Sequence, residues 1–130
     1  MATVQEPPRL TSVLKWEDDK NYCREEITVL AGSGSDRVLT IGTILGRITA
    51  SSKIVGLNLA ASDGSQTVYG VLLSNTTAPD GVDIAGLALV RGPAVVSDIG
   101  LVYPAGATGA QKTTINTALL NLGIVIRQGL

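Results

Sequence analysis

Short runs of aliphatic and β-branched residues, separated by glycine and Asx turns, constrain the fold of this chain more than any other feature. Runs of strand length bounded by such turns are typical of β-strands. The breaks fall at Gly32–Asp36, Asp63–Ser65, Asp80–Gly81 and Gly92–Pro93. The strands predicted between them are Ile27–Leu30, Val38–Ile41, Thr43–Thr49, Lys53–Leu59, Thr67–Leu73, Ile84–Arg91 and Ala94–Ser97.

One helix is predicted near the C-terminus. Thr108 and Gln111 have the spacing of a capping box, in which each side chain satisfies a backbone amide of the other. The apolar face follows at Ile115, Ala118, Leu119 and Leu122, and Gly123 suits the position that ends a helix. Ile124–Arg127 then predicts a final strand. We therefore expect a mainly β (α+β) single domain with six to eight strands and one helix.

Charge divides the chain into two regions. Of its 21 charged residues, 10 basic and 11 acidic, 10 lie within residues 1–26, whereas all 15 glycines lie from Gly32 onward. We interpret residues 1–20 as an extended N-terminal arm and residues 21–130 as the folded, β-rich body. Pro7 and Pro8 favour an extended backbone. Four further apolar residues of the arm have no obvious place in a free-standing core: Leu10, Val13, Leu14 and Trp16. Removing the arm is thus expected to leave the body folded.

The body has an unusually uncharged surface. Residues 27–130 carry only 11 charges, and their polar residues are mostly Ser, Thr, Asn and Gly. A soluble monomer normally covers itself with Lys and Glu. One interpretation is a monomer with a hydroxyl-rich surface. The favoured one is that sister subunits or a larger partner cover much of the body.

Composition argues against several functional classes. The chain has no His, which removes the commonest general base and metal ligand and lowers the expectation of an enzyme. A net charge of -1 and only four aromatic residues argue against a nucleic-acid partner. No apolar run is long enough to span a membrane, and the N-terminal residues do not resemble a signal peptide. We expect no cofactor, and folding in the cytoplasm of the producing cell.

Isolated motifs have ordinary structural explanations. Gly32–Ser35 precedes a strand rather than the helix that a phosphate loop needs, so a turn is favoured. Asp63, Asp80 and Asp83 lack cation-site spacing and suit turns. Without a histidine partner, Cys23 is interpreted as a small, partly buried residue next to Tyr22. Arg91 lies at the end of a predicted strand. It either forms an ion pair at a subunit contact or is simply solvated.

An ordered set of segments over about residues 20–127 resembles the phage lambda-type head decoration protein family. The segments are Tyr22–Glu25 with Ile27–Ala31, Gly42–Thr49, Ala61–Thr67 with Gly70–Leu73, Leu89–Gly92, Gln111–Lys112 and Gly123–Arg127. Cys23 departs from the Ser that the family prefers there, which is a small polar exchange. The residues before position 20 fall outside the recognisable match.

The resemblance implies a β-clip or β-tulip-like body and a structural, non-enzymatic role. Such proteins form homotrimers at local three-fold positions on the outside of the expanded capsid of the virion. They stabilise the shell against the pressure of packaged DNA, and their N-terminal segment adds backbone pairing to the major capsid protein. The implied capsid contacts lie in the arm at Pro7, Pro8, Leu10, Val13, Leu14 and Trp16. Tyr22, Arg24 and Arg91 are the candidate trimer contacts.

Two other functions compete with this one. A β-rich binding module for carbohydrate or a host surface would need an exposed aromatic platform, and the chain has few aromatic residues. A hydrolase without His would need a clustered carboxylate pair, and Glu25 and Glu26, adjacent in a strand, would point to opposite faces.

Overall fold

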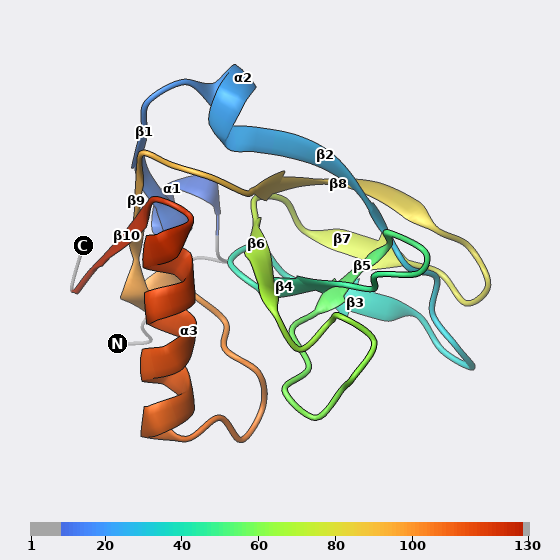
Figure 1. Ribbon diagram of the computed structural model, residues 1–130. Coiled ribbons are helices and arrows are strands. Elements are labelled where there is room, and N and C mark those ends of the chain that lie inside the picture. The colour runs from blue at the N-terminus through green and yellow to red at the C-terminus, as the bar shows by residue number, and fades with distance from the viewer. Residues whose placement is uncertain (1–8, 129–130) are drawn as a thin grey trace, which may run out of the picture.

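A computed structural model describes residues 9–128 of the chain. Within this range the protein is mainly β, with ten strands in three sheets and one helix longer than a single turn (Figure 1). The prediction of a mainly β domain with a helix near the C-terminus is confirmed. The strands outnumber the six to eight expected, because two short ones, near the N-terminus and at residues 76–78, carry weak sequence signals.

A closed five-stranded barrel forms the largest part of the domain. Its strands, in order around the barrel, are β2 (Arg24–Val29), β5 (Ile54–Gly56), β4 (Ile44–Arg47), β6 (Val68–Leu72) and β8 (Ile84–Leu89). The longest pairing joins β2 to β8, antiparallel from Arg24–Leu89 to Val29–Ile84. Closure leaves these strands without free edges. One core cluster inside contains Ile27, Val29, Leu45, Ile54 and Leu72.

A three-stranded sheet lies beside the barrel. It consists of β1 (Leu14–Glu17), β9 (Ala94–Ser97) and β10 (Ile124–Arg127), with β9 in the middle, antiparallel to β1 and parallel to β10 (Figure 1). The helix α3 (Gly109–Asn121) packs against β10 and sends Ile115 and Leu119 into the core. These two side chains join Ala94, Val96 and Ile124 in a second core cluster.

Residues 9–23, which fall mostly within the predicted N-terminal arm, belong to this folded domain. One helical turn, α1 (Leu10–Val13), leads into β1, and a second turn, α2 (Lys20–Cys23), connects β1 to the barrel. Val13 is completely buried, and Leu10 and Leu14 pack against the same core cluster. The expectation that these apolar residues lack a place in the core is therefore wrong, because β1 completes a sheet edge that the sequence did not reveal.

The remaining elements are short. The strands β3 (Arg37–Leu39) and β7 (Thr76–Ala78) form a two-stranded antiparallel sheet, and η1 (Asp98–Gly100) is a 3-10 turn directly after β9. The predicted strands Ala94–Ser97 and Ile124–Arg127 are observed with the same bounds. The strand β2 begins three residues earlier than predicted, β3 is shifted toward the N-terminus, and the other predicted strands are shorter.

The ends of α3 follow the predicted chemistry. The Thr108 hydroxyl accepts from the Gln111 amide at 3.2 Å, and the Gln111 side chain accepts from the Thr108 amide at 2.9 Å. Gly123 has a φ of +86°, a left-handed conformation that glycine adopts without strain. The helix thus begins and ends where local side-chain chemistry predicts.

Candidate interaction surfaces

Two of the three candidate trimer residues, Tyr22 and Arg91, lie in direct contact. The Arg91 guanidinium lies over the Tyr22 ring, 5.2 Å from its centroid, and Nη1 donates to the Tyr22 carbonyl at 2.5 Å. Its Nη2 also pairs with the Glu25 carboxylate at 3.0 Å. Of the two alternatives for Arg91, an ion pair at a subunit contact or a solvated strand end, the structure shows an ion pair, but with a partner in the same chain. We call Tyr22, Glu25 and Arg91 the α2 cluster.

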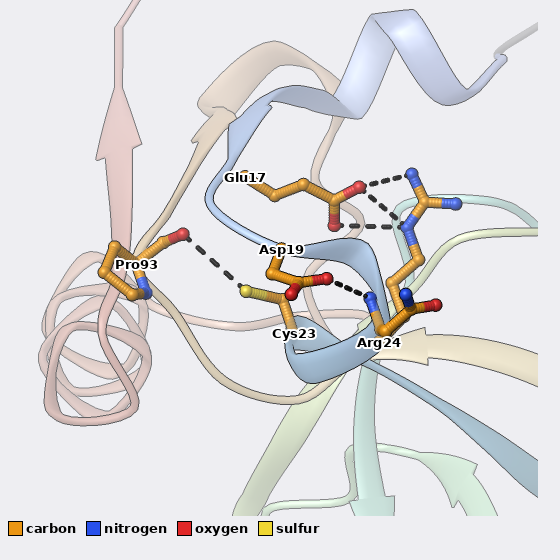
Figure 2. A network of polar contacts seen from close by, with 6 residues as sticks. Glu17, Asp19, Cys23, Arg24 and Pro93 are labelled. Atoms are coloured by element: carbon orange, nitrogen blue, oxygen red, sulfur yellow. Dashed lines mark hydrogen bonds and ion pairs between the residues drawn. The ribbon is translucent and has the colours of Figure 1, made fainter.

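The third candidate, Arg24, pairs with β1. Its Nε donates to both Glu17 carboxylate oxygens, at 2.9 and 3.1 Å, and its Nη2 donates to Oε1 at 2.5 Å (Figure 2). The two side chains are only 22% and 13% exposed. Because a planar two-point pair fixes orientation, it holds the end of β1 against the start of β2. Much of the Arg24 side chain is therefore engaged within the domain.

A second tyrosine continues this polar surface along the barrel. The guanidinium of Arg47 lies 5.7 Å from the centre of the Tyr69 ring. Burial, and next the nearby Glu25 carboxylate, raise the pKa of the Tyr69 phenol. Sequence analysis did not single out Tyr69 or Arg47. Their contact joins separate strands, β4 and β6, so spacing along the chain gave no signal for it.

The candidate capsid-contact residues have different environments. Trp16 is 52% exposed, the largest solvent-facing side chain of the N-terminal segment. Leu10 and Leu14 are half-buried against the core, and Val13 is fully buried. Pro7 and Pro8 lie outside the described residues. Among the described candidates, Trp16 is thus the one whose side chain is mostly available to a partner.

The aspartates weighed as cation ligands have turn and pairing roles. Asp80 accepts from the Gly34 amide at 2.9 Å, and the Asp63 carboxylate accepts from the Ser65 amide at 3.0 Å. The hydrogen bond from the Ser65 hydroxyl, and next the one from the Ser65 amide, lower the pKa of Asp63. Asp83 pairs with Lys53 at 2.5 Å and accepts from the Ala31 amide, and these contacts lower its pKa. Within residues 9–128, no group of three or more potential ligands gathers around a metal position.

The surroundings of the single cysteine indicate a structural role. Cys23 is completely buried at the end of α2, and its Sγ lies 3.8 Å from the Pro93 carbonyl oxygen (Figure 2). Cys23 is thus a structural residue, as expected, but it is buried more completely than the partial burial that the sequence suggested. Across the part of the chain that the structure describes, no helix is long and apolar enough to cross a membrane.

The barrel and its flanking sheet define a small, mainly β domain that exposes Trp16 and Tyr22 to solvent. A scan against protein-family models matches residues 3–124 to the family of bacteriophage lambda head decoration protein D. The chain belongs to this family of structural phage head proteins. A search of curated proteins finds no match.

Family membership establishes the general role: the protein decorates a phage capsid and is part of the virion. The match begins at residue 3, so it also covers the N-terminal segment that the sequence resemblance, starting near residue 20, had left out.

Proposed function

We propose that this protein is a homotrimer that binds the outside of the expanded phage capsid and stabilises the shell. The observation that carries the proposal is the match to the head decoration family over residues 3–124. The partner is the major capsid protein, and the subunits fold in the host cytoplasm before they dock. This role suits a body whose residues 27–130 carry only 11 of the 21 charges, because sister subunits and the shell would cover much of its surface.

The α2 cluster, with Arg24 beside it, is the proposed trimer contact. Tyr22 is 58% exposed, and its ring is already fixed by the Arg91 guanidinium. Tyrosine and arginine are enriched at interface hot spots, and a side chain held in place loses less entropy on association. The Arg91 and Glu25 side chains are 39% and 46% exposed, so both still present polar atoms to a neighbouring subunit.

The N-terminal segment is the proposed capsid contact, with Trp16 as its apolar anchor. Residues 1–8, including Pro7 and Pro8, would pair with an edge of the capsid protein as an added strand. Val13 is not a capsid contact in this proposal, because its side chain is completely buried and stabilises the domain. Three such segments on one trimer would bind together, so that modest individual contacts give a stable clamp.

The test is co-sedimentation of the purified protein with expanded and unexpanded capsids of its phage. Saturable binding to expanded capsids alone, together with greater resistance of those capsids to heat, supports the proposal. Equal binding to both forms would contradict the dependence on expansion. Binding to neither would overturn the cementing role, and a glycan-binding screen would then test the alternative of a surface-binding module. Sedimentation equilibrium of the free protein tests the trimer.

A further inference from the structure

Three apolar side chains form a row across the three-stranded sheet. In the strand register Trp16 of β1 pairs with Val95 of β9, and Val95 pairs with Val125 of β10. Directly paired residues on neighbouring strands project from the same face of a sheet. Trp16, Val95 and Val125 therefore stand side by side on one face, which we call the outer row.

The opposite face of this sheet is the one that faces the core. Ala94, Val96 and Ile124, which alternate with the residues of the outer row, are at most 1% exposed and belong to a core cluster. Trp16 is 52% exposed, and Val95 and Val125 are half-buried. None of the three residues of the outer row is part of either core cluster formed by the described residues. The outer row is thus an apolar strip on the solvent side of the sheet.

The surface around the edge of β10 is of mixed polarity, because the groove there is lined by Lys112, Asn116 and Thr117 as well as by apolar side chains. Val125 also lines an open groove of about 700 Å³ between β10 and α3. Ile126 and Leu120 line the same groove, and Leu120 is 58% exposed. The groove thus adjoins the outer row at its Val125 end, and Trp16 lies at the other end of the row.

The point where residues 1–8 join the described part of the chain favours the capsid shell as the occupant of this surface. Residues 1–8 are joined through α1 directly to β1, the strand that carries Trp16. Eight residues reach at most about 29 Å when fully extended. A capsid surface that captures residues 1–8 therefore lies within that distance of α1, and the strands that contact α1 are β1 and β9 of the three-stranded sheet (Figure 1).

We infer that the outer row and the adjoining β10–α3 groove form a second docking surface for the capsid shell. The inference rests on the proposed capsid binding and adds to it a contact formed by the folded domain. A tryptophan flanked by aliphatic side chains on a rigid sheet has the composition of an interface hot spot. Docking would hold the sheet against the shell while the N-terminal segment binds beside it.

Charge introduced into the row tests the inference. Val125→Lys should weaken binding to expanded capsids about tenfold or more, because a half-buried apolar contact becomes a desolvated charge. The matched control is Val38→Lys, which places the same charge at a 64% exposed valine on β3, outside this sheet. This control should bind like the wild type. Binding is measured by co-sedimentation, with melting temperature and oligomeric state recorded for each variant.

Each outcome is decisive. Wild-type binding to capsids with equal binding by Val125→Lys overturns the second surface but leaves the proposed function standing. Loss of the oligomer in Val125→Lys would assign the row to a contact between copies and also overturn it. Failure of the wild type to bind any capsid overturns both proposals. Should Val125→Lys unfold, Val125→Thr, of similar volume, replaces it with the same expectation in direction.

Discussion

The guanidinium of Arg24 donates hydrogen bonds from Nε and Nη2 to the carboxylate of Glu17, at 2.9 and 2.5 Å, and so links β1 to the barrel. Removing one charge should destabilise the domain, because the other remains largely buried without its partner. Glu17→Gln is expected to lower the free energy of unfolding by about 1–3 kcal/mol. Urea denaturation measures the effect. Glu26→Gln, on an exposed side chain of the same region, is the control and should be nearly neutral.

Truncation should separate the two parts of the N-terminal segment. Deleting residues 1–8 is expected to leave the melting temperature nearly unchanged and to weaken capsid binding. Deleting residues 1–17 removes Val13 and β1, which uncovers one edge of β9 and opens the core. That variant should lose several degrees of melting temperature or fail to fold. Equal melting temperatures for both truncations would show that β1 contributes nothing to stability.

Trp16 and Val13 should have opposite effects when each is replaced by alanine. Trp16→Ala is expected to reduce capsid affinity with little change in melting temperature, because its side chain is 52% exposed. Val13→Ala should lower the free energy of unfolding by about 1.5–3 kcal/mol, the value of a buried valine side chain. Thermal melts and co-sedimentation of the two variants, run together, provide the comparison. A large drop in the melting temperature of Trp16→Ala would remove its role as a free anchor.

Features with local causes could be predicted from the sequence. The helix α3 was predicted with its cap, because Thr108 and Gln111 lie three residues apart and act on each other. The glycine-bounded runs gave most of the barrel strands for the same reason. By contrast, β1 is held in place by its pairing with β9, some 80 residues later. The segment Leu14–Glu17 does alternate apolar and polar residues, but over only four residues, the shortest run that indicates a strand.

The same distinction between local causes and distant pairing applies to the candidate contact residues. Tyr22, Arg24 and Arg91 were named from the resemblance, but their partners were not, since Glu25 lies 66 residues from Arg91 along the chain. The sequence did not predict the burial of Val13, because an apolar residue in a charged segment gives the same sequence pattern whether it packs in the core or contacts a partner. Only pairing between residues far apart in the sequence distinguishes a core position from a partner contact, and spacing along the chain does not show such pairing.

Gly70 should be intolerant of any side chain. A Cβ added there would lie 2.4 Å from the Leu89 carbonyl oxygen on the paired strand β8, and the nearest atoms are all backbone, which cannot move aside as a flexible side chain can. Gly70→Ala is therefore expected to cost about 1–3 kcal/mol or more of folding free energy. Gly109→Ala is the control, because a Cβ at the start of α3 meets nothing within 4 Å. The control should be neutral or slightly stabilised in urea denaturation.

The Lys53–Asp83 pair should make stability depend on pH in the acid range. The hydrogen bond from Lys53, and next the one from the Ala31 amide, lower the pKa of Asp83 from its ordinary value of 3.8. A carboxyl whose pKa is lower in the folded state stabilises the fold above its unfolded pKa, and this contribution disappears as pH falls through the folded value. The melting temperature of the wild type should therefore fall when the pH drops below about 4.

Asp83→Asn isolates this contribution, since the amide cannot titrate. The variant is expected to melt lower than the wild type at neutral pH, and the difference should shrink as the pH falls through the folded pKa of Asp83. Lys53→Met removes the first cause of the lowered pKa and should reduce the same pH dependence while leaving the Ala31 contact. A difference between wild type and Asp83→Asn that stays constant from neutral to strongly acid pH would show that Asp83 does not act through its charge.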